Sequence, residues 1–476
     1  MSTENDRCEE IATIGGRKQL FVDDYIVAQK SNVARKLGEI SRENGARPVM
    51  VPNEREDVLY FGVYSTVLHD GDRFKMWYLA TNRPDYDIGY AESRDGIHWE
   101  RPDVGEDGRG NFVFQGHGFS CFIDADEDDA DHRFKAAYGP AGNFVKEQKA
   151  IHLAHSPDGI HWTPYNGGRA VLPRTWFPHP HIEGRKYVTA ADTHNYMIRD
   201  GEAGLYRIFT RDIYEGPQEG DEKKISRGSR SMSNPDVKAD PTGWTMQRSW
   251  EFDREGPEEY RKRQIYALTN WIYEGVHFAL MSVLKSPGGL IDFYLGTSRD
   301  AHSWDLTWVY AGQPLIPPGQ PGSFDAAGAF PFSQVVTWKN RHWLYYGAMD
   351  KGHKDLENYM SIGLATLRLD GFVSLEAGSE PGEVATRPFK LQGRGLELNV
   401  DASRGRVLVE ILDEVGGPIA GFTQEEFQDI GGRDELRLQP RWSERADLAS
   451  LNGKIIRLKF IMQDARLYAF KVNSHN

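Results

Sequence analysis

The sequence Ser93-Arg-Asp-Gly-Ile-His-Trp99 decides the fold, because variants of it recur along the chain. It returns as Ser156-Pro-Asp-Gly-Ile-His-Trp162 and, less closely, as Ser298-Arg-Asp-Ala-His-Ser-Trp304. Degenerate copies at Thr210-Arg-Asp-Ile213 and Leu369-Asp-Gly-Phe372 bring the number of units to five. The Asp-Gly pair accepts the positive φ values of a two-residue hairpin, and the Trp anchors the next strand to the core. We interpret the repeated aspartates and histidines as hairpin chemistry, since one active site does not need five copies of them.

Short segments of alternating polarity flank these turns. Examples are residues 64–69 with 74–79, 119–123 with 134–138, and 334–338 with 342–346. Four antiparallel strands repeated five times between residues 20 and 376 predict a five-bladed β-propeller. The functional site is then expected at its central axis.

The composition changes after Glu376. Glycines punctuate the chain, and segments with a period of two follow at residues 396–400, 406–412, 435–438, 454–461 and 466–472. This pattern predicts a β-sandwich over residues 377–476, while residues 1–19 are expected to form an N-terminal tail. The predicted fold class is all-β, a five-bladed propeller followed by a β-sandwich.

Composition excludes several classes of partner. The 476 residues carry 57 Lys+Arg and 70 Asp+Glu, a net charge of −13, with no basic cluster for nucleic acid or an anionic membrane. Cys8 and Cys121 are the only cysteines, too few for a disulfide framework or a cysteine-ligated zinc site. The first residues lack the basic and apolar regions of a signal peptide, so a cytoplasmic protein is expected, or a secreted one if such a peptide was trimmed.

Propeller strands alternate in direction, so the starts of the innermost strands and the ends of the second strands face one mouth of the axis. Carboxylates, imidazoles and aromatic rings at that mouth are the groups that glycosidic cleavage needs. The candidate catalytic residues are Asp325, Glu56, Asp57 and Asp192. The candidate substrate-binding residues are Tyr64, His117, Trp176, His179, His181, His194, Arg263, Gln264, Asp350 and His353.

Asp325 is the favoured carboxylate, because the small residues that follow it leave room for a ligand, although a turn-capping role is an alternative. Glu56 and Asp57 lie at the entry to the first blade and could equally belong to a solvated loop. Asp192 is followed closely by His194, and a buried carboxylate beside an imidazole would have a shifted pKa.

No cofactor is certain, but a divalent metal is one alternative. His179 and His181 face the same side of a strand, and with His194 or Asp192 they could bind Zn²⁺ or Mn²⁺. The same imidazoles could instead contact sugar hydroxyls or act as the general acid. Arg263 could pair with the acid group of a charged sugar, or brace neighbouring blades.

The acidic run from Asp124 to Asp131 resembles the start of a calcium loop. Asp129 and Lys135 stand where an EF-hand requires Gly and Glu, so the motif fails. We expect a solvated hairpin tip there.

The repeated turns and the trailing sandwich resemble the glycoside hydrolase family 32 and 43 superfamily, and within it the family 32-like bacterial proteins. The most specific matches are Leu20-Phe-Val-Asp-Asp-Tyr25, Lys75-Met-Trp-Tyr78, Gly322-Ser-Phe-Asp-Ala326 with Tyr345-Tyr-Gly347, and Leu369-Asp-Gly-Phe-Val373. The usual carboxylate motifs are not matched. Gly62, Arg174-Thr-Trp-Phe-Pro178 and Arg263-Gln264-Ile265 stand near the three places where the family carries them.

The resemblance implies a glycosidase that removes terminal sugars, furanosides among them, from an oligosaccharide or glycoside substrate. Loss of the family carboxylates favours a second interpretation, a carbohydrate-binding propeller without catalysis. A third is a metal-assisted sugar lyase or a phosphorylase. The sequence leaves these alternatives open, together with the oligomeric state.

Overall fold

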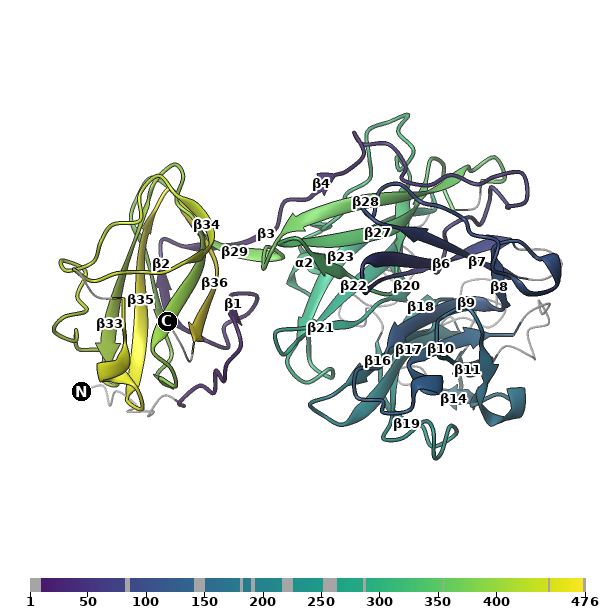
Figure 1. The fold of residues 1–476 in the computed structure, drawn as a ribbon, viewed down its shortest axis with the longest axis horizontal. Coiled ribbons are helices and arrows are strands. Elements are labelled where there is room, and N and C mark those ends of the chain that lie inside the picture. Colours follow the sequence, from purple (N-terminus) through teal and green to yellow (C-terminus); the bar gives the residue numbers. More distant parts are fainter. Residues whose placement is uncertain are drawn as a thin grey trace. The chain divides into compact units, whose positions relative to one another are not determined.

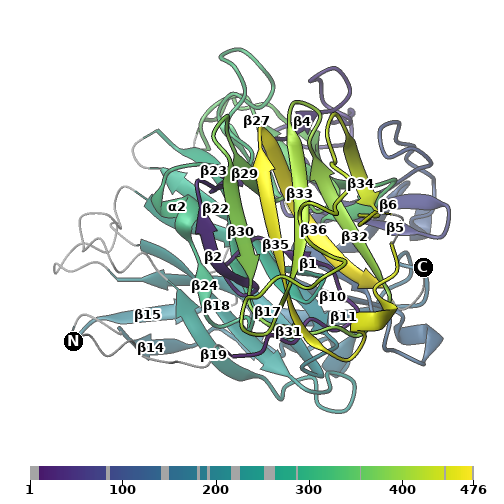
Figure 2. The ribbon, with the colours of Figure 1, turned by 90° about the vertical axis from the view of Figure 1, so that its left-hand side faces the viewer.

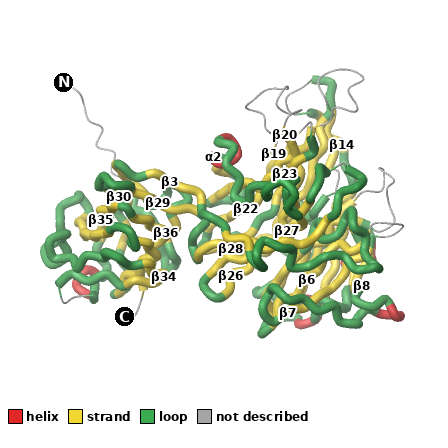
Figure 3. The backbone as a smooth tube through the Cα atoms, turned by 90° about the horizontal axis from the view of Figure 1, so that it is seen from above, coloured by secondary structure: helices red, strands yellow, loops and turns green. Residues whose placement is uncertain are grey.

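A computed structural model describes residues 10–81, 86–140, 150–179, 183–189, 193–215, 226–250, 263–285, 288–353, 355–443 and 446–473, without the side chains of residues 226, 247–250 and 263. Strands dominate these residues, and helix is confined to short segments (Figure 3). The described helical segments are η1 (Glu106–Gly108), η2 (Ala130–His132), η4 (Tyr165–Gly168), α2 (Thr307–Tyr310) and η6 (Ala449–Leu451). Within this part of the chain, no helix is both long and apolar enough to span a membrane. The all-β prediction is confirmed.

Five groups of antiparallel strands follow one another along the chain and form the blades of the propeller (Figure 1). Blade I contains β5 (Thr66–Asp70), β6 (Arg73–Thr81), β7 (Asp87–Ser93) and β8 (Phe112–Gln115). Blade II contains β9 (His117–Ile123), β10 (Phe134–Gly139), β11 (Ala150–Ser156), β12 (Thr163–Pro164) and β13 (Leu172–Pro173). Blade III contains β14 (Trp176–Pro178), β15 (Lys186–Thr189), β16 (Tyr196–Asp200), β17 (Leu205–Tyr214), β18 (Ser226–Asn234) and β19 (Thr245–Trp250).

Blades IV and V share one continuous sheet, because a parallel bridge joins Ile291 to Gly328. Blade IV contains β20 (Arg263–Leu268), β21 (Trp271–Tyr273), β22 (Val276–Lys285), β23 (Leu290–Ser298) and β24 (Trp304–Asp305). Blade V contains β25 (Gly328–Pro331), β26 (Val336–Trp338), β27 (Arg341–Met349), β28 (Met360–Arg368) and β4 (Ser41–Arg42). Since β4 precedes blade I in the chain, its pairing with β28 closes the ring.

The repeated turns have the hairpin chemistry that the sequence predicts. Ser93 Oγ accepts the amide of Gly96, whose φ is 76°, and Ser156 Oγ accepts the amide of Gly159, whose φ is 82°. Each turn also contacts a neighbouring blade. Trp77 Nε1 donates to the Gly159 carbonyl at 2.6 Å, and the Tyr345 hydroxyl donates to the Gly96 carbonyl at 2.7 Å. The copies therefore join blade to blade, which explains their recurrence without a catalytic role.

Two sheets form the sandwich, and Figure 2 shows their strands side by side. One sheet contains β1 (Gln19–Leu20), β3 (Ala34–Leu37), β29 (Val373–Ala377), β32 (Gly395–Asp401), β34 (Asp434–Leu438) and β36 (Ala465–Asn473). The other contains β2 (Val27–Ser31), β30 (Gly382–Thr386), β31 (Phe389–Lys390), β33 (Arg406–Asp413) and β35 (Ile455–Gln463).

The predicted domain boundaries at residues 20 and 377 need correction, because three N-terminal strands belong to the sandwich. Gln19 in β1 pairs with Phe470, Lys30 in β2 with Val384, and Ser374 with Lys36 in β3. Among the described residues, the sandwich unit comprises those up to Glu39, Lys339–Arg341 and those from Leu367 onward, while the propeller unit comprises those within Ile40–Trp338 and His342–Thr366.

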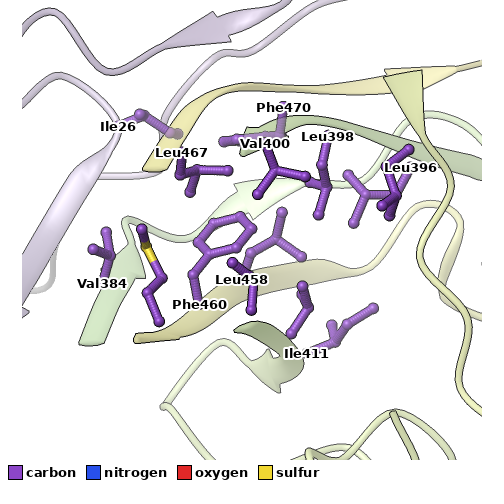
Figure 4. Packing of buried hydrophobic residues seen from close by; sticks show 14 of the residues in the cluster. Ile26, Val384, Leu396, Leu398, Val400, Ile411, Leu458, Phe460, Leu467 and Phe470 are labelled. Carbon is purple, nitrogen blue, oxygen red and sulfur yellow. The ribbon is translucent and has the colours of Figure 1, made fainter. Parts of the chain in front are cut away.

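The sandwich core lies between its two sheets, where alternate residues of each strand point inward (Figure 4). Leu398 and Leu467 from one sheet and Phe460 from the other are fully buried there. Ile26 and Phe21 from the N-terminal segment are also fully buried in this core. Apolar burial thus fixes this segment in the sandwich, whereas the sequence assigned it to the propeller.

Candidate functional site

Aromatic and imidazole side chains from all five blades meet at the propeller axis. The rings of Tyr64 and His117 lie 5.3 Å apart between centroids, and those of Tyr64 and His194 lie 5.7 Å apart. Phe330 lies 6.0 Å from Tyr64 and 5.3 Å from Tyr266. We call this group the axial cluster; it consists of Tyr64, His117, His194, Tyr266, Phe330 and His353.

A hydrogen-bonded chain runs through the axial cluster. The hydroxyl of Tyr64 donates to the hydroxyl of Tyr266 at 3.3 Å, and that hydroxyl lies 3.0 Å from Nε2 of His353. Burial, and then the neighbouring Tyr266, raise the pKa of Tyr64 well above its usual value. Tyr64 is therefore a protonated phenol that donates, while His353 is half-buried at the outer end of the chain.

The backbone of Tyr64 adopts an unusual conformation that places its ring at the axis. Its φ is +53°, in the left-handed region that bulky residues rarely enter. Gly62, two residues earlier, has a φ of +71°, and a Cβ there would stand 2.5 Å from Cγ1 of Ile362. Such backbone strain persists only where surrounding structure enforces it, and it concentrates at functional sites.

His194 presents an unprotonated nitrogen inside the protein. Its Nε2 lies 2.8 Å from the Phe119 carbonyl oxygen, which can only accept a hydrogen bond, so Nε2 carries the proton. Burial lowers the pKa of His194 well below its usual value, so the ring is neutral. Its Nδ1 is buried and has no hydrogen-bond partner among the described residues.

Two arginines of blade III lie behind Tyr266. The guanidinium carbon of Arg211 is 4.2 Å from the centroid of the Tyr266 ring, and its Nε donates to the Tyr266 carbonyl at 3.1 Å. Arg227 lies 5.8 Å from the same ring and donates from Nη1 to Oε1 of Gln264. These cations hold Tyr266 in place through its π-face and backbone.

Tyr266, Phe330 and the two arginines are site residues that the sequence reasoning missed. Gln264 is predicted from the same strand, and Tyr266 follows it by two residues, at a bulge between Ile265 and Ala267. The spacing of two from Gln264 within an innermost strand is the signal that could have marked Tyr266.

Asp325, the favoured catalytic residue, is engaged in structural contacts. Arg42 Nε donates to its Oδ2 at 2.8 Å, the Tyr346 hydroxyl donates to the same oxygen at 3.1 Å, and Ser323 Oγ donates to Oδ1 at 2.8 Å. The residue is 2% exposed, and a Cβ on Gly319 would stand 1.9 Å from Oδ1. Because Arg42 lies in the ring-closing strand β4, this carboxylate secures the closure of the propeller.

Glu56 is also held by an arginine. Arg101 donates from Nε to Oε1 at 3.1 Å and from Nη2 to Oε2 at 3.0 Å, and the Tyr78 hydroxyl donates to Oε1 at 2.7 Å. Asp57 differs, because it is half-buried and its Oδ1 accepts only the amide of Leu59, at 2.8 Å, among the described residues. Of the candidate catalytic carboxylates that the structure describes, Asp57 is the one that has no cationic partner among the described residues.

The other predicted residues do not gather at the axial cluster. Trp176 is 52% exposed and lies 5.5 Å from the Arg174 guanidinium. His179 packs against Tyr214 at 5.4 Å, and Asp350 accepts the amide of Tyr359 at 2.7 Å. Asp192, His181 and the Arg263 side chain lie outside the described residues. Within the described parts of the chain, no group of three or more His, Cys, Asp or Glu side chains could hold a metal ion.

The acidic run of blade II is not merely solvated, as the sequence suggested. Lys135 Nζ is fully buried and donates to Asp124 Oδ2 at 2.8 Å and to Glu127 Oε2 at 2.9 Å. The Tyr206 hydroxyl donates to Asp124 Oδ2 at 2.6 Å. An internal ammonium group thus takes the place that a cation would have in a calcium loop.

No family model and no curated protein matches this chain. Among solved structures, it is similar to a glycoside hydrolase, with 14% identity and a TM-score of 0.43 over 67% of this chain and 91% of that one. It is also similar to an N-acetylgalactosamine deacetylase from F. plautii in complex with blood group B trisaccharide, with 13% identity and a TM-score of 0.44 over 72% and 97%. A thermostable family-43 glycoside hydrolase shows 12% identity and a TM-score of 0.41 over 66% and 91%. Likenesses of this size assign no activity to this chain.

Proposed function

We propose that this protein is a carbohydrate-active enzyme that binds a terminal sugar at the axial cluster and hydrolyses its glycosidic bond. The hydrogen-bonded chain from Tyr64 through Tyr266 to His353 is the observation that carries the proposal. Three blades supply its members, so the groups converge only in the closed propeller. Phenols and imidazoles offer donors and acceptors for sugar hydroxyls, and ring faces pack on sugar C–H groups.

The chain suits proton transfer as well as binding. Hydrolysis gives the glycosidic oxygen a proton and the anomeric carbon a hydroxyl group from water. Tyr266 and His353 form a pair through which a proton can reach the half-buried end of the chain at His353. We assign the water-activating carboxylate to Asp57 or Asp192, because arginines already hold Asp325 and Glu56.

A substrate screen tests the proposal. Purified protein is incubated with aryl glycosides, furanosides among them, and with plant and microbial oligosaccharides, with and without a chelator or added phosphate. We expect release of a monosaccharide that Asp57→Asn or Asp192→Asn slows by at least about a hundredfold, the size of a lost acid or base. Full activity in both Asp57→Asn and Asp192→Asn would remove the carboxylate assignment. Chelator sensitivity or phosphate dependence would point instead to a metal-assisted lyase or a phosphorylase.

The contacts of the carboxylates favour a second function, glycan binding without catalysis. Asp325 and Glu56 are each engaged by an arginine and a tyrosine hydroxyl, which leaves them as poor nucleophiles or bases. Binding of a sugar with no turnover over days, lost in Tyr266→Phe, would support this function over hydrolysis. If no glycan in the screen is bound or hydrolysed, hydrolysis and glycan binding are both contradicted.

A further inference from the structure

A pocket of about 280 Å³ lies at the ends of the innermost strands that are opposite the axial cluster. His117, Tyr196 and Gly328 begin innermost strands at the first end, whereas Ile123 and Ile198 lie at or near the last residues of β9 and β16. Ile123 and Ile198 line the new pocket together with residues of blades IV and V, and we call it the distal pocket. Its volume is small for an oligosaccharide and suits one sugar unit.

Hydrogen bonds join the innermost strands between the two ends, and one of them crosses the axis. The Tyr196 hydroxyl of blade III donates to the Pro331 carbonyl of blade V at 3.0 Å, although these blades are not neighbours in the ring. Thr66 Oγ1 of blade I lies 2.5 Å from Ser333 Oγ of blade V. The distal pocket is therefore a site of its own and not an extension of the axial cluster.

Arg199 supplies the polar chemistry of the distal pocket. Its guanidinium lies 4.7 Å from the Tyr206 ring and donates from Nε to Asp126 Oδ2 at 3.1 Å. Neither of its terminal nitrogens donates to a described residue, and Nη1 is buried. Because Nη1 is closed to solvent, Nη2 is the terminal nitrogen left to donate to an acceptor oxygen of a ligand.

Asp126 and the apolar walls narrow the ligand class. The Asp126 carboxylate is half-exposed and already neutralises Arg199, so the pocket does not need an anion. The pocket offers a cationic hydrogen-bond donor, Arg199, beside an acceptor, Asp126. Two vicinal hydroxyls fit this pair, because one can accept from Arg199 while the other donates to Asp126. Ile198, Ile272 and Val335 present apolar surface for the C–H face of a ring.

We propose that the distal pocket binds one neutral monosaccharide, with a hydroxyl pair on Arg199 and Asp126 and the C–H face against the isoleucines. This site does not depend on the proposed hydrolysis at the axial cluster.

Isoleucine methyl NMR on the full chain tests the proposal, with Ile198 and Ile272 signals identified through Ile198→Val and Ile272→Val. D-glucose, D-galactose and L-arabinose are titrated separately, with sodium acetate as the anionic probe. We expect at least one sugar to shift both signals with a Kd on the order of millimolar. Arg199→Met should weaken that binding at least about tenfold, a loss of about 1.4 kcal/mol. Tyr266→Phe should leave it unchanged, which separates this site from the axial cluster.

Arg94→Met is the matched control, because Arg94 pairs with Asp72 on the surface and is 72% exposed. Arg199→Lys serves as a second variant if Arg199→Met does not fold. No shift with any sugar up to about 0.1 M, a concentration at which millimolar sites are saturated, would overturn the proposal. Shifts with acetate alone, or sugar shifts that persist unchanged in both Arg199 variants, would also overturn it.

Discussion

The Tyr266 hydroxyl lies 3.0 Å from Nε2 of His353, and the two residues belong to the neighbouring blades IV and V. The same hydroxyl accepts from Tyr64 of blade I, so it joins three blades at the axis. Hydroxyl groups in this position can bind a sugar, pass a proton or hold the blades together. Substitutions that remove one contact at a time separate these roles.

Tyr266→Phe removes the middle of the chain and keeps the ring that Arg211 covers. We expect sugar turnover or binding to fall at least about tenfold, while the free energy of unfolding falls by only about 1 kcal/mol, the usual net value of one hydrogen bond. Kinetics or calorimetry with the sugar from the screen, beside denaturant unfolding, measures both. Tyr359→Phe, at a residue 42% exposed, should change neither quantity. Unchanged turnover and binding in Tyr266→Phe would contradict a role in the site.

Asp325→Asn should lower the free energy of unfolding by about 3 kcal/mol, because it leaves the Arg42 guanidinium without its carboxylate. The estimate is at the low end for buried pairs, since the Arg42 side chain is 23% exposed. Asp57→Asn should change stability by less than about 1 kcal/mol, because it alters one turn hydrogen bond. Denaturant unfolding of both variants checks this order; the reverse order would return Asp325 to the list of catalytic residues.

His194 should make stability depend on pH below its unfolded pKa of about 6.5. Burial lowers the pKa of His194 in the folded protein. Below about pH 6.5 the imidazole therefore binds a proton in the unfolded chain but stays neutral in the folded one. The stabilising effect is therefore complete above pH 6.5 and declines as the pH falls, by up to about 1.4 kcal/mol per pH unit. Denaturant unfolding at pH 7.5 and 5.5 measures the slope. The His194→Asn variant should show a shallower slope, and an equal slope would assign the effect to other groups.

Lys135→Met should lower the free energy of unfolding by about 3–5 kcal/mol, because it leaves the buried Asp124 carboxylate without its cationic partner. Calcium should not raise the melting temperature of the native protein, since the ammonium group already lies between Asp124 and Glu127. Thermal unfolding with millimolar calcium or with a chelator compares the two conditions. A calcium-dependent rise in the native protein would show that the loop binds a cation beside Lys135.

Phe21→Ala should destabilise the sandwich by about 3–5 kcal/mol, the usual cost of deleting a buried aromatic ring. Phe21 is fully buried, and its ring lies 6.2 Å from Phe460 and 6.0 Å from Phe470. Tyr25→Phe is a mild control in the same segment, because it keeps the ring and removes a hydroxyl whose hydrogen bond to the Thr13 carbonyl is exposed. A negligible effect of Phe21→Ala on unfolding would contradict the place of this segment in the sandwich core and would agree with the sequence-based boundary, which assigned Phe21 to the propeller.

The sequence was sufficient for features that depend on neighbouring residues. The Ser-x-Asp-Gly turns close through contacts within four residues, such as the one between Ser156 Oγ and the Gly159 amide. Their spacing therefore reveals five blades, and strict alternation from Leu396 onward reveals the sandwich. Tyr64, His117, His194 and His353 could be predicted for the axis, because each lies at the start of an innermost strand or the end of a second one.

Which of these groups can act depends on contacts between residues far apart in the sequence. Arg42 reaches Asp325 across 283 positions of the chain, so no local pattern shows that the favoured carboxylate is already engaged. The bulge before Ala267 and the positive φ of Tyr64 redirect side chains that a regular strand would place elsewhere. The N-terminal strands join the sandwich because Gln19 pairs with Phe470 at the far end of the chain. Turn geometry and strand period are local and can be read from sequence, whereas ion pairs, bulges and strand partners depend on contacts that form only when the chain closes.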